Sequence, residues 1–236
     1  MSLSTSPKSN TAVTLQQLIE TSGNDRDRQS HSLTQALTTL ISTYSSQLPK
    51  AKTSIAHIPF EQFRLDSRQL VASDVFVLLK SQTPNCQKSR DYLYQSAEQA
   101  AFILSEIDPI ALLSTASVPP HANTSFTNDS DRSKAQQQLA ALPCPVVYVP
   151  NIRDFLGDLI QARLQHQQPV TLPTVVAVTG TNGKTTISQL VAQLTQLTGM
   201  SSAVMGTAGN GRLGALVQAS HTTGDALAVQ QFLYQM

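Results

Sequence analysis

Cysteine is scarce in this chain of 236 residues, where it occurs only as Cys86 and Cys144. Neither residue belongs to a CxxC pair or to a Cys/His cluster with the spacing of metal ligands. Both are therefore predicted to be reduced, structural thiols. The sequence offers no metal site built on sulfur.

Charge is also low, and long apolar runs are missing. Lys plus Arg number 16 against 15 for Asp plus Glu, a formal net charge of +1, and no long basic run occurs. Such a composition gives no electrostatic basis for nonspecific binding to nucleic acid or to a membrane surface. The first residues are polar, unlike a secretory signal, and no run of about 18 apolar residues could span a membrane. The predicted location is the cytoplasm, with neither nucleic acid nor membrane as a partner.

Short apolar runs that alternate with helical patterns predict an α/β fold in two parts. The chain exceeds the usual length of ~100–200 residues for one domain, and the polar segment QHQQPVTLP interrupts the pattern. We place the boundary near Gln168, which gives domains at residues 1–168 and 169–236. Residues 114–138 have so few large apolar side chains that they are predicted to be a flexible insertion.

Apolar periodicity predicts the elements of the first domain. Its helices are marked by Leu15, Leu18 and Ile19, by the set Tyr92, Leu93, Ala97 and Ala100, and by the stretch from Ile152 to about Gln165. Its strands are predicted at residues 55–60, 74–80, 101–104 and 145–149.

The second domain opens on TVVAVTG at residues 174–180, a continuous β-branched run typical of a buried parallel strand. A helix is predicted after the next turn, because its apolar residues repeat at spacings of three and four and Gly199 is placed to end it. These apolar residues are Ile187, Leu190, Val191, Leu194 and Leu197. A strand at residues 202–206, a glycine-rich turn and a helix from Asp225 onward complete the expected order.

The sequence GTNGKTT at residues 180–186 joins that first strand to that helix and is predicted to bind the phosphates of ATP. Its two glycines allow a tight turn, Lys184 can reach the β- and γ-phosphates, and the Thr185 hydroxyl can bind Mg²⁺. Val178 stands where the general pattern has an earlier glycine, so the loop is a shorter variant. Lys184 is the candidate catalytic residue and Thr185 the candidate metal ligand. ATP contacts are expected from Gly180, Thr181, Asn182, Gly183, Lys184, Thr185 and Thr186. An ordinary glycine turn is the alternative, but the flanking strand and helix favour a phosphate loop.

This loop, followed by SAVMGTAGNG and then HTTGDA, resembles the Mur ligases that build the stem peptide of peptidoglycan, the MurE type in particular. The resemblance extends to LDSRQLVASDVFVLL at residues 65–79, which is similar to the start of the family's substrate-binding domain. Two separated motifs in the right order are more specific than either motif alone.

The resemblance implies an ATP- and Mg²⁺-dependent ligase that adds meso-diaminopimelate or L-lysine to UDP-N-acetylmuramoyl-L-alanyl-D-glutamate. ATP phosphorylates the substrate carboxylate, and the incoming amine then attacks the acyl phosphate. Catalysis of the first step rests on positioning and charge neutralisation. Residues 1–168 would bind the UDP-MurNAc substrate, and residues 169–236 would begin a P-loop-type parallel-sheet ATP-binding domain. The amino acid would be bound by a later, C-terminal domain.

The resemblance also implies a set of substrate contacts. Those to the UDP part are Leu65, Ser67, Gln82 and Thr83. Those to the muramoyl-dipeptide are Thr222 and Thr223, with His221 standing where some relatives have asparagine. Without the resemblance, the same residues are typical turn and cap formers.

Parts of such a ligase have no counterpart before Met236, among them a carbamylated lysine and the later metal-binding carboxylate and histidine. The polypeptide by itself is therefore expected not to complete the ligation. Two alternatives stay open. One is a MurF-type ligase, although the loop of that type usually reads GSxGKT. The other is a truncation that binds a nucleotide or UDP-sugar without catalysis.

Overall fold

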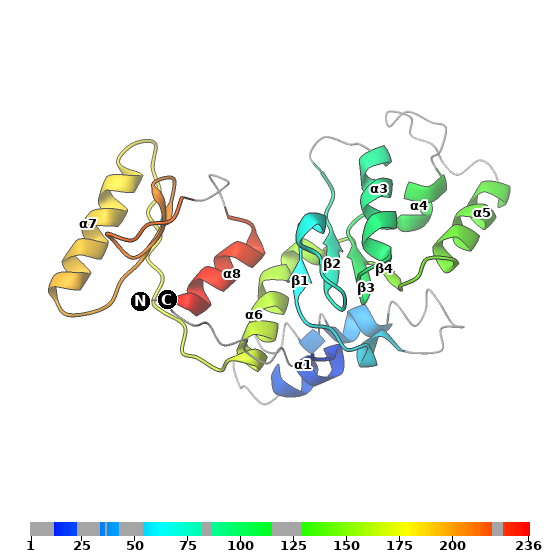
Figure 1. Cartoon of the computed structure of the whole chain (residues 1–236), viewed down its shortest axis with the longest axis horizontal. Helices are drawn as coiled ribbons and strands as arrows, with labels where there is room; N and C mark the ends of the chain where they lie inside the picture. Colours follow the sequence, from blue (N-terminus) through cyan, green and yellow to red (C-terminus); the bar gives the residue numbers. More distant parts are fainter. Residues whose placement is uncertain are drawn as a thin grey trace, which may run out of the picture. The chain divides into compact units, whose positions relative to one another are not determined.

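The computed structural model describes residues 12–22, 34–35, 37–42, 54–81, 86–114, 129–218 and 224–236. Contacts between residues divide the chain into unit 1, Met1–Gln167, and unit 2, Gln168–Met236. Figure 1 labels the α-helices of both units and the strands β1–β4 of unit 1. Among the described residues, no helix has the length and apolar character needed to cross a membrane.

The centre of unit 1 is a four-stranded parallel sheet with strand order β1-β2-β3-β4. The strands are β1 Phe63–Arg64, β2 Val75–Leu78, β3 Phe102–Ser105 and β4 Val146–Tyr148. Every residue of β2 and β3 is buried, as expected for strands that are covered on both faces. The sheet confirms the predicted α/β class and the predicted strands β2, β3 and β4.

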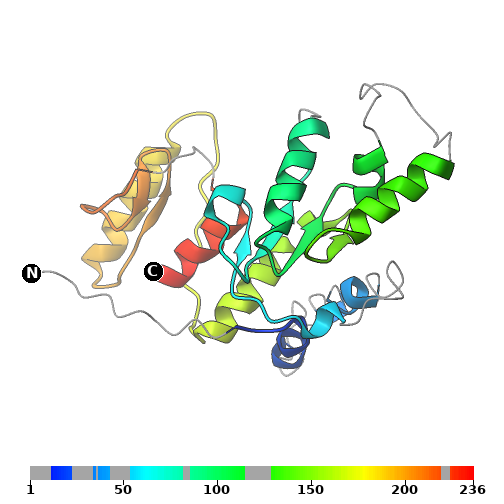
Figure 2. The same cartoon turned by 45° about the vertical axis from the view of Figure 1, so that its right-hand side comes forward.

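Helices cover both faces of this sheet (Figures 1 and 2). Side chains alternate along a strand, so Phe76 and Ile103 face one side, where Leu93 and Ala135 complete a buried cluster. Phe102 faces the other side and meets the ring of Phe60 edge-on, with 5.6 Å between centroids. The α-helices are α1 Leu15–Ser22, α3 Cys86–Ala97, α4 Pro109–Ser114, α5 Asp129–Ala140 and α6 Leu156–Gln167. The short 3₁₀ turns are η1 Ile55–His57, η2 Ser67–Gln69 and η3 Ile152–Asp154.

Two predictions for unit 1 differ from the structure. Residues 55–57 form η1 rather than part of a strand, and Pro59 cannot donate to a strand ladder. Within residues 55–60, only Phe60 pairs, with Val13, through two main-chain bonds of 2.8 Å. The last part of the segment predicted to be a flexible insertion, residues 129–138, lies in α5. Ala135 is buried and Leu139 packs against the same core, so an i, i+4 pair holds an otherwise polar helix in place. Residues 115–128 lie outside the described residues.

Unit 2 contains α7 Lys184–Leu197, β5 Val204–Gly206, β6 Gly209–Gly211 and α8 Ala226–Gln235. Both helices and β5 were predicted. Gly199, with φ of 82°, follows α7 in the left-handed conformation that ends many helices. The Asp225 carboxylate caps α8 by accepting a bond from Ala228 N at 2.8 Å. The glycine-rich turn folds back as β6, which pairs antiparallel with β5 and was not predicted.

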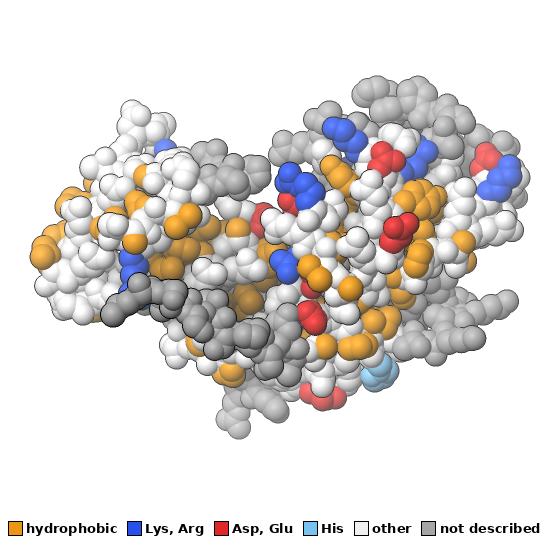
Figure 3. All heavy atoms as spheres, in the orientation of Figure 1, with side chains coloured by type: hydrophobic (Ala, Val, Ile, Leu, Met, Phe, Trp, Pro, Cys, Tyr) orange, Lys and Arg blue, Asp and Glu red, His pale blue; other side chains and the backbone are white. Residues whose placement is uncertain are grey.

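The predicted strand at residues 174–180 is not formed, and the predicted apolar face of α7 lies open. Val175 and Val176 are 67% and 66% exposed, and Leu194 on α7 is 55% exposed. An apolar run becomes a buried strand only beside partner strands. In the described part of unit 2, β5 pairs with β6 and neither pairs with this run. On the side of unit 2 visible in Figure 3, apolar side chains accordingly outnumber charged ones.

Candidate functional site

The predicted phosphate loop, residues 180–186, runs into the first turn of α7, and its two glycines adopt conformations that other residues rarely take. Gly180 has φ of 143°, and Gly183, at the N-cap of α7, has φ of 78°. An α-helix leaves its first N–H groups without carbonyl partners one turn back. The first such bond in α7 runs from Ile187 N to Gly183 O at 2.9 Å. The amides of the preceding turn are thus available to an anion, which the positive end of a 14-residue helix also favours.

Replacing Gly183 with alanine is expected to disturb the loop through its backbone alone. A Cβ at this position would meet nothing within 4 Å, so the penalty comes from the left-handed φ. That conformation costs an L-residue about 1–2 kcal/mol, which corresponds to a loss of roughly 5- to 30-fold in affinity for ATP. Titration calorimetry with ATP measures the loss. Gly206→Ala is the matched control, because Gly206 also has open space around it and no positive φ. Equal affinity in the two variants would show that the conformation of Gly183 is unimportant.

The Lys184 side chain folds back over the loop that precedes it. Its Nζ donates to Gly180 O at 2.6 Å and to Thr181 O at 3.2 Å. The exposed ammonium therefore lies against the loop carbonyls, beside the first turn of α7. A cation held here adds to the positive end of the helix, which suits a polyphosphate.

Thr185 connects the loop to the hairpin of unit 2. Its Oγ1 lies 3.3 Å from Oγ1 of Thr207, which directly follows β5. Sequence reasoning missed Thr207, although this residue belongs to the MGTAGN stretch that carries the resemblance. The described residues contain no group of three His, Cys, Asp or Glu side chains that could hold a metal. The hydroxyl oxygens of Thr185 and Thr207 could supply the few protein ligands that Mg²⁺ commonly takes, while phosphates and water would supply the rest.

In unit 1, Leu65 and Ser67 lie where the chain leaves β1. The Asp66 carboxylate caps η2 by accepting from Arg68 N at 3.0 Å and also pairs with the Arg68 guanidinium at 2.7 Å. Ser67 is partly exposed and lines a cavity of about 260 Å³. Its other lining residues are Leu70, Gln95, Ser96, Glu98 and Gln99. Within the described structure, Ser96 Oγ is buried without a hydrogen-bond partner.

A cluster of polar contacts lies at the carboxyl ends of β2, β3 and β4. Glu106 follows β3 and pairs with Arg153 of η3, with 2.7 Å between Oε1 and Nε. Burial raises the pKa of Glu106, but the hydrogen bonds from Arg153 and from Lys80 N together lower it below its ordinary value. The carboxylate is therefore charged at neutral pH. Its contribution to stability is present above the ordinary pKa and is lost as the pH falls through the lowered one.

The other predicted substrate contacts cannot be placed, whereas Cys144 can. Gln82, Thr83, His221, Thr222 and Thr223 lie outside the described residues, so their roles stay predictions. Cys144 is buried, and burial raises the pKa of its thiol to about 12, which excludes a role as a nucleophile at neutral pH. Of the residues predicted to bind substrate, the structure describes only Leu65 and Ser67, both at the end of β1.

Residues 178–236 match the Mur ligase middle domain, a stretch that includes the predicted phosphate loop, Thr207 and α8. Over this stretch the chain is similar to the Mur ligases. A match that begins at Val178 aligns the predicted loop, α7 and the β5/β6 hairpin with that middle domain.

Several curated relatives of the chain carry the name UDP-N-acetylmuramoyl-L-alanyl-D-glutamate--2,6-diaminopimelate ligase. The protein of that name from Haemophilus ducreyi is 36% identical over 177 residues, covering 75% of this chain and 32% of the relative. The one from Vibrio vulnificus is 34% identical over 179 residues, covering 76% and 31%. A solved structure of a ligase with that name aligns with a TM-score of 0.57 at 30% identity, covering 82% of this chain and 33% of the other. The chain therefore spans about a third of the length of these relatives.

Proposed function

We propose that this chain belongs to a MurE-type ligase that joins meso-diaminopimelate to UDP-N-acetylmuramoyl-L-alanyl-D-glutamate at the expense of ATP. The observation that carries the proposal is the phosphate loop, where Lys184 and Thr185 open α7 beside Thr207. The name shared by the relatives favours diaminopimelate over L-lysine as the amino acid. The cytoplasm stays the predicted location.

The two units would divide the work. In unit 2, the amides at the start of α7 and the Lys184 ammonium would bind the β- and γ-phosphates of ATP. The Thr185 hydroxyl, next to Thr207, would help to hold Mg²⁺, which supplies charge neutralisation when bound. In unit 1, Leu65 and Ser67 at the carboxyl end of β1 would contact the UDP part of the acceptor, since open parallel sheets bind ligands outside the carboxyl ends of their strands.

The reaction expected of such a ligase has two steps. An oxygen of the acceptor carboxylate attacks the γ-phosphorus of ATP, giving an acyl phosphate and ADP. The neutral amine of diaminopimelate then attacks the acyl carbon; phosphate leaves, and the amine loses a proton as the amide forms. Lys184 stabilises negative charge on the transferred phosphoryl group, so its contribution is electrostatic.

The test is phosphate release by the protein expressed from its complete reading frame. ATP, UDP-MurNAc-L-Ala-D-Glu and meso-diaminopimelate together are expected to release phosphate and form an amide, and omission of any one of them should stop both. Turnover with the UDP-MurNAc-tripeptide and D-Ala-D-Ala instead would indicate the MurF type. Tight binding of ATP or a UDP-sugar without turnover on either acceptor would indicate a binding module.

A further inference from the structure

Three residues from separate loops meet at the carboxyl edge of the sheet in unit 1. Lys80 comes two residues after β2, Glu106 comes directly after β3, and Arg153 lies in η3, shortly after β4. Because all strands of this sheet are parallel, these chain exits lie at the same edge as the exit from β1. We call Lys80, Glu106 and Arg153 the Lys80 clamp.

The contacts of the Lys80 clamp hold one peptide segment from both sides. Glu106 Oε2 accepts the main-chain N–H of Lys80 at 2.6 Å, and Arg153 Nη2 donates to the main-chain oxygen of Lys80 at 2.7 Å. Glu106 and Arg153 are in turn bonded to each other at 2.7 Å. The paired side chains of Glu106 and Arg153 thus hold the main chain of Lys80 at both its N–H and its carbonyl oxygen. Charge-assisted bonds of this kind are stronger and more directional than neutral ones.

Stability alone gives little reason for this arrangement. The Arg153 side chain is 53% exposed, and an ion pair that is this open to water contributes little to stability. The strands themselves are held by their ladder and by a buried apolar cluster that includes Phe76, Leu78 and Ile103. The β2/β3 register runs as far as Leu78 with Ser105, and the clamp takes over beyond it, at Lys80.

We propose that Glu106 and Arg153 are positioning residues of the acceptor site, which fix the path of the main chain from β2 so that the nucleotide-sugar substrate can bind at this edge. The inference rests on the proposed function. Leu65 and Ser67 leave β1, the neighbour of β2, at the same edge. Ligands of open parallel sheets bind outside the carboxyl ends of the strands, where small shifts of the main chain change the fit of the ligand.

The test compares Arg153→Met with Lys134→Met in the 236-residue chain. Methionine keeps an unbranched apolar side chain but removes every donor of Arg153. Lys134 belongs to an exposed pair with Asp131, 3.8 Å apart, which is the matched control. Titration calorimetry is run with UDP-MurNAc-L-Ala-D-Glu and separately with ATP. Arg153→Met should weaken the nucleotide-sugar about tenfold, leave ATP affinity within about twofold and leave the melting temperature almost unchanged. Lys134→Met should change none of these.

A second pair of variants separates positioning from loss of charge. Arg153→Lys keeps the charge but has one nitrogen, whereas arginine uses Nε and Nη2 for its two contacts here. It should therefore restore only part of the affinity. Glu106→Gln should also weaken only the nucleotide-sugar, because its amide can accept from Lys80 N or from Arg153 but not from both. Wild-type affinity in Arg153→Met, or an equal loss of ATP binding and melting temperature, would overturn the inference. No binding of the nucleotide-sugar to the wild-type chain would instead overturn the proposed role of unit 1 in binding the UDP-substrate.

Discussion

Replacing Lys184 with alanine is expected to remove ATP-dependent turnover from the complete enzyme while binding of the UDP-substrate stays within about twofold, since distant sites act independently. In the structure, the Lys184 ammonium lies 2.6 Å from Gly180 O, inside the loop that opens α7. It is the only Lys or Arg of that helix. Removing one preorganised group that stabilises transition-state charge typically lowers the rate by about 10²- to 10³-fold. Loss of a cation that also binds the phosphates of ATP in the ground state should lower kcat/KM further, because the affinity for ATP falls as well.

The measurement is initial-rate kinetics with ATP varied, together with calorimetry for the UDP-substrate. Lys134→Ala is the lysine control, since that side chain lies 73% exposed on α5 and pairs with Asp131 at 3.8 Å. Lys184→Arg keeps the charge but replaces a compact ammonium by a planar group, so partial activity is expected. Turnover by Lys184→Ala at the wild-type rate would refute the assignment of residues 180–186 as the phosphate loop.

Much of the candidate site could be predicted from sequence because it depends on local order. A glycine pair followed by Lys184 and Thr185 sets the loop and the helix start through neighbours in the chain, and α7 begins where this pattern requires. Thr207 could not be predicted from spacing alone, since a turn in the hairpin brings its hydroxyl to Thr185. The Lys80 clamp was missed for the same reason: its members are far apart in sequence and meet only because their strands are parallel.

The strands also divide into those that the sequence predicts and those that depend on a partner strand. Strands β2, β3 and β4 were predictable because each is a short apolar run that is buried on both faces. β1 is two residues long and is defined by its pairing with β2, so no periodicity marks it. Residues 174–180 have a stronger apolar signal than β1 and still form no strand. Strand formation depends on a partner as much as on composition.

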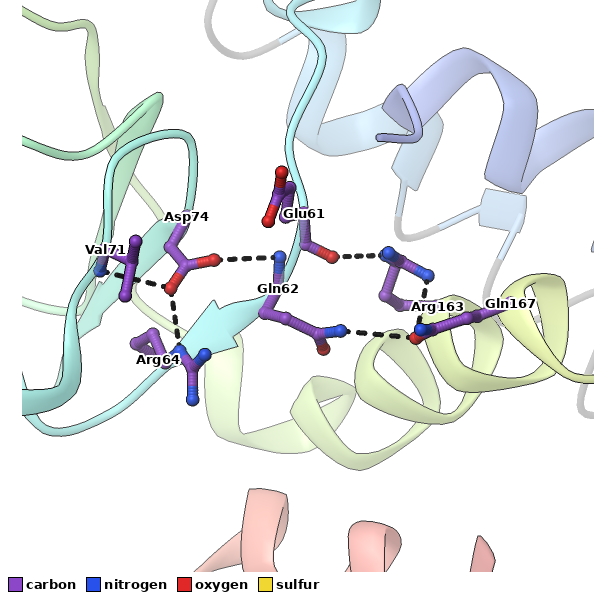
Figure 4. A network of polar contacts seen from close by, with 7 residues as sticks. All are labelled: Glu61, Gln62, Arg64, Val71, Asp74, Arg163 and Gln167. Atoms are coloured by element: carbon purple, nitrogen blue, oxygen red, sulfur yellow. Dashed lines mark hydrogen bonds and ion pairs between the residues drawn. The ribbon is translucent and has the colours of Figure 1, made fainter. Parts of the chain in front are cut away.

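Asp74 belongs to the segment LDSRQLVASDVFVLL, residues 65–79, that supported the family resemblance, and the structure gives it a part in the fold. The side chain is buried and collects three donors, as Figure 4 shows. Its Oδ1 accepts from Gln62 N at 3.1 Å, and its Oδ2 accepts from Val71 N at 3.2 Å and from Arg64 Nε at 2.7 Å. One carboxylate, directly before β2, thereby ties together the approach to β1, β1 itself and the turn before β2.

The same network reaches α6. Arg163 is buried and donates from Nε to Glu61 O at 2.5 Å, while Gln62 Nε2 donates to Gln167 Oε1 at 3.2 Å. Burial lowers the pKa of Arg163, and the nearby Glu61 and Asp74 charges act in the opposite direction. Residues 61–64 are thus held by Asp74 on one side and by α6 on the other (Figure 4).

Replacing Asp74 with alanine is therefore expected to destabilise unit 1 by about 2–4 kcal/mol, because two main-chain N–H groups and a guanidinium lose their acceptor. For a domain of this size, that corresponds to a fall of roughly 4–16 °C in melting temperature. Asp74→Asn should lie between, since its amide oxygen can replace only one carboxylate oxygen. Asp131→Ala is the control: its side chain is 54% exposed and its pair with Lys134 spans 3.8 Å, so its effect should stay within about 0.5 kcal/mol. Urea unfolding followed by circular dichroism measures all three variants. Equal stability of Asp74→Ala and Asp131→Ala would show that the Asp74 carboxylate does not hold the fold.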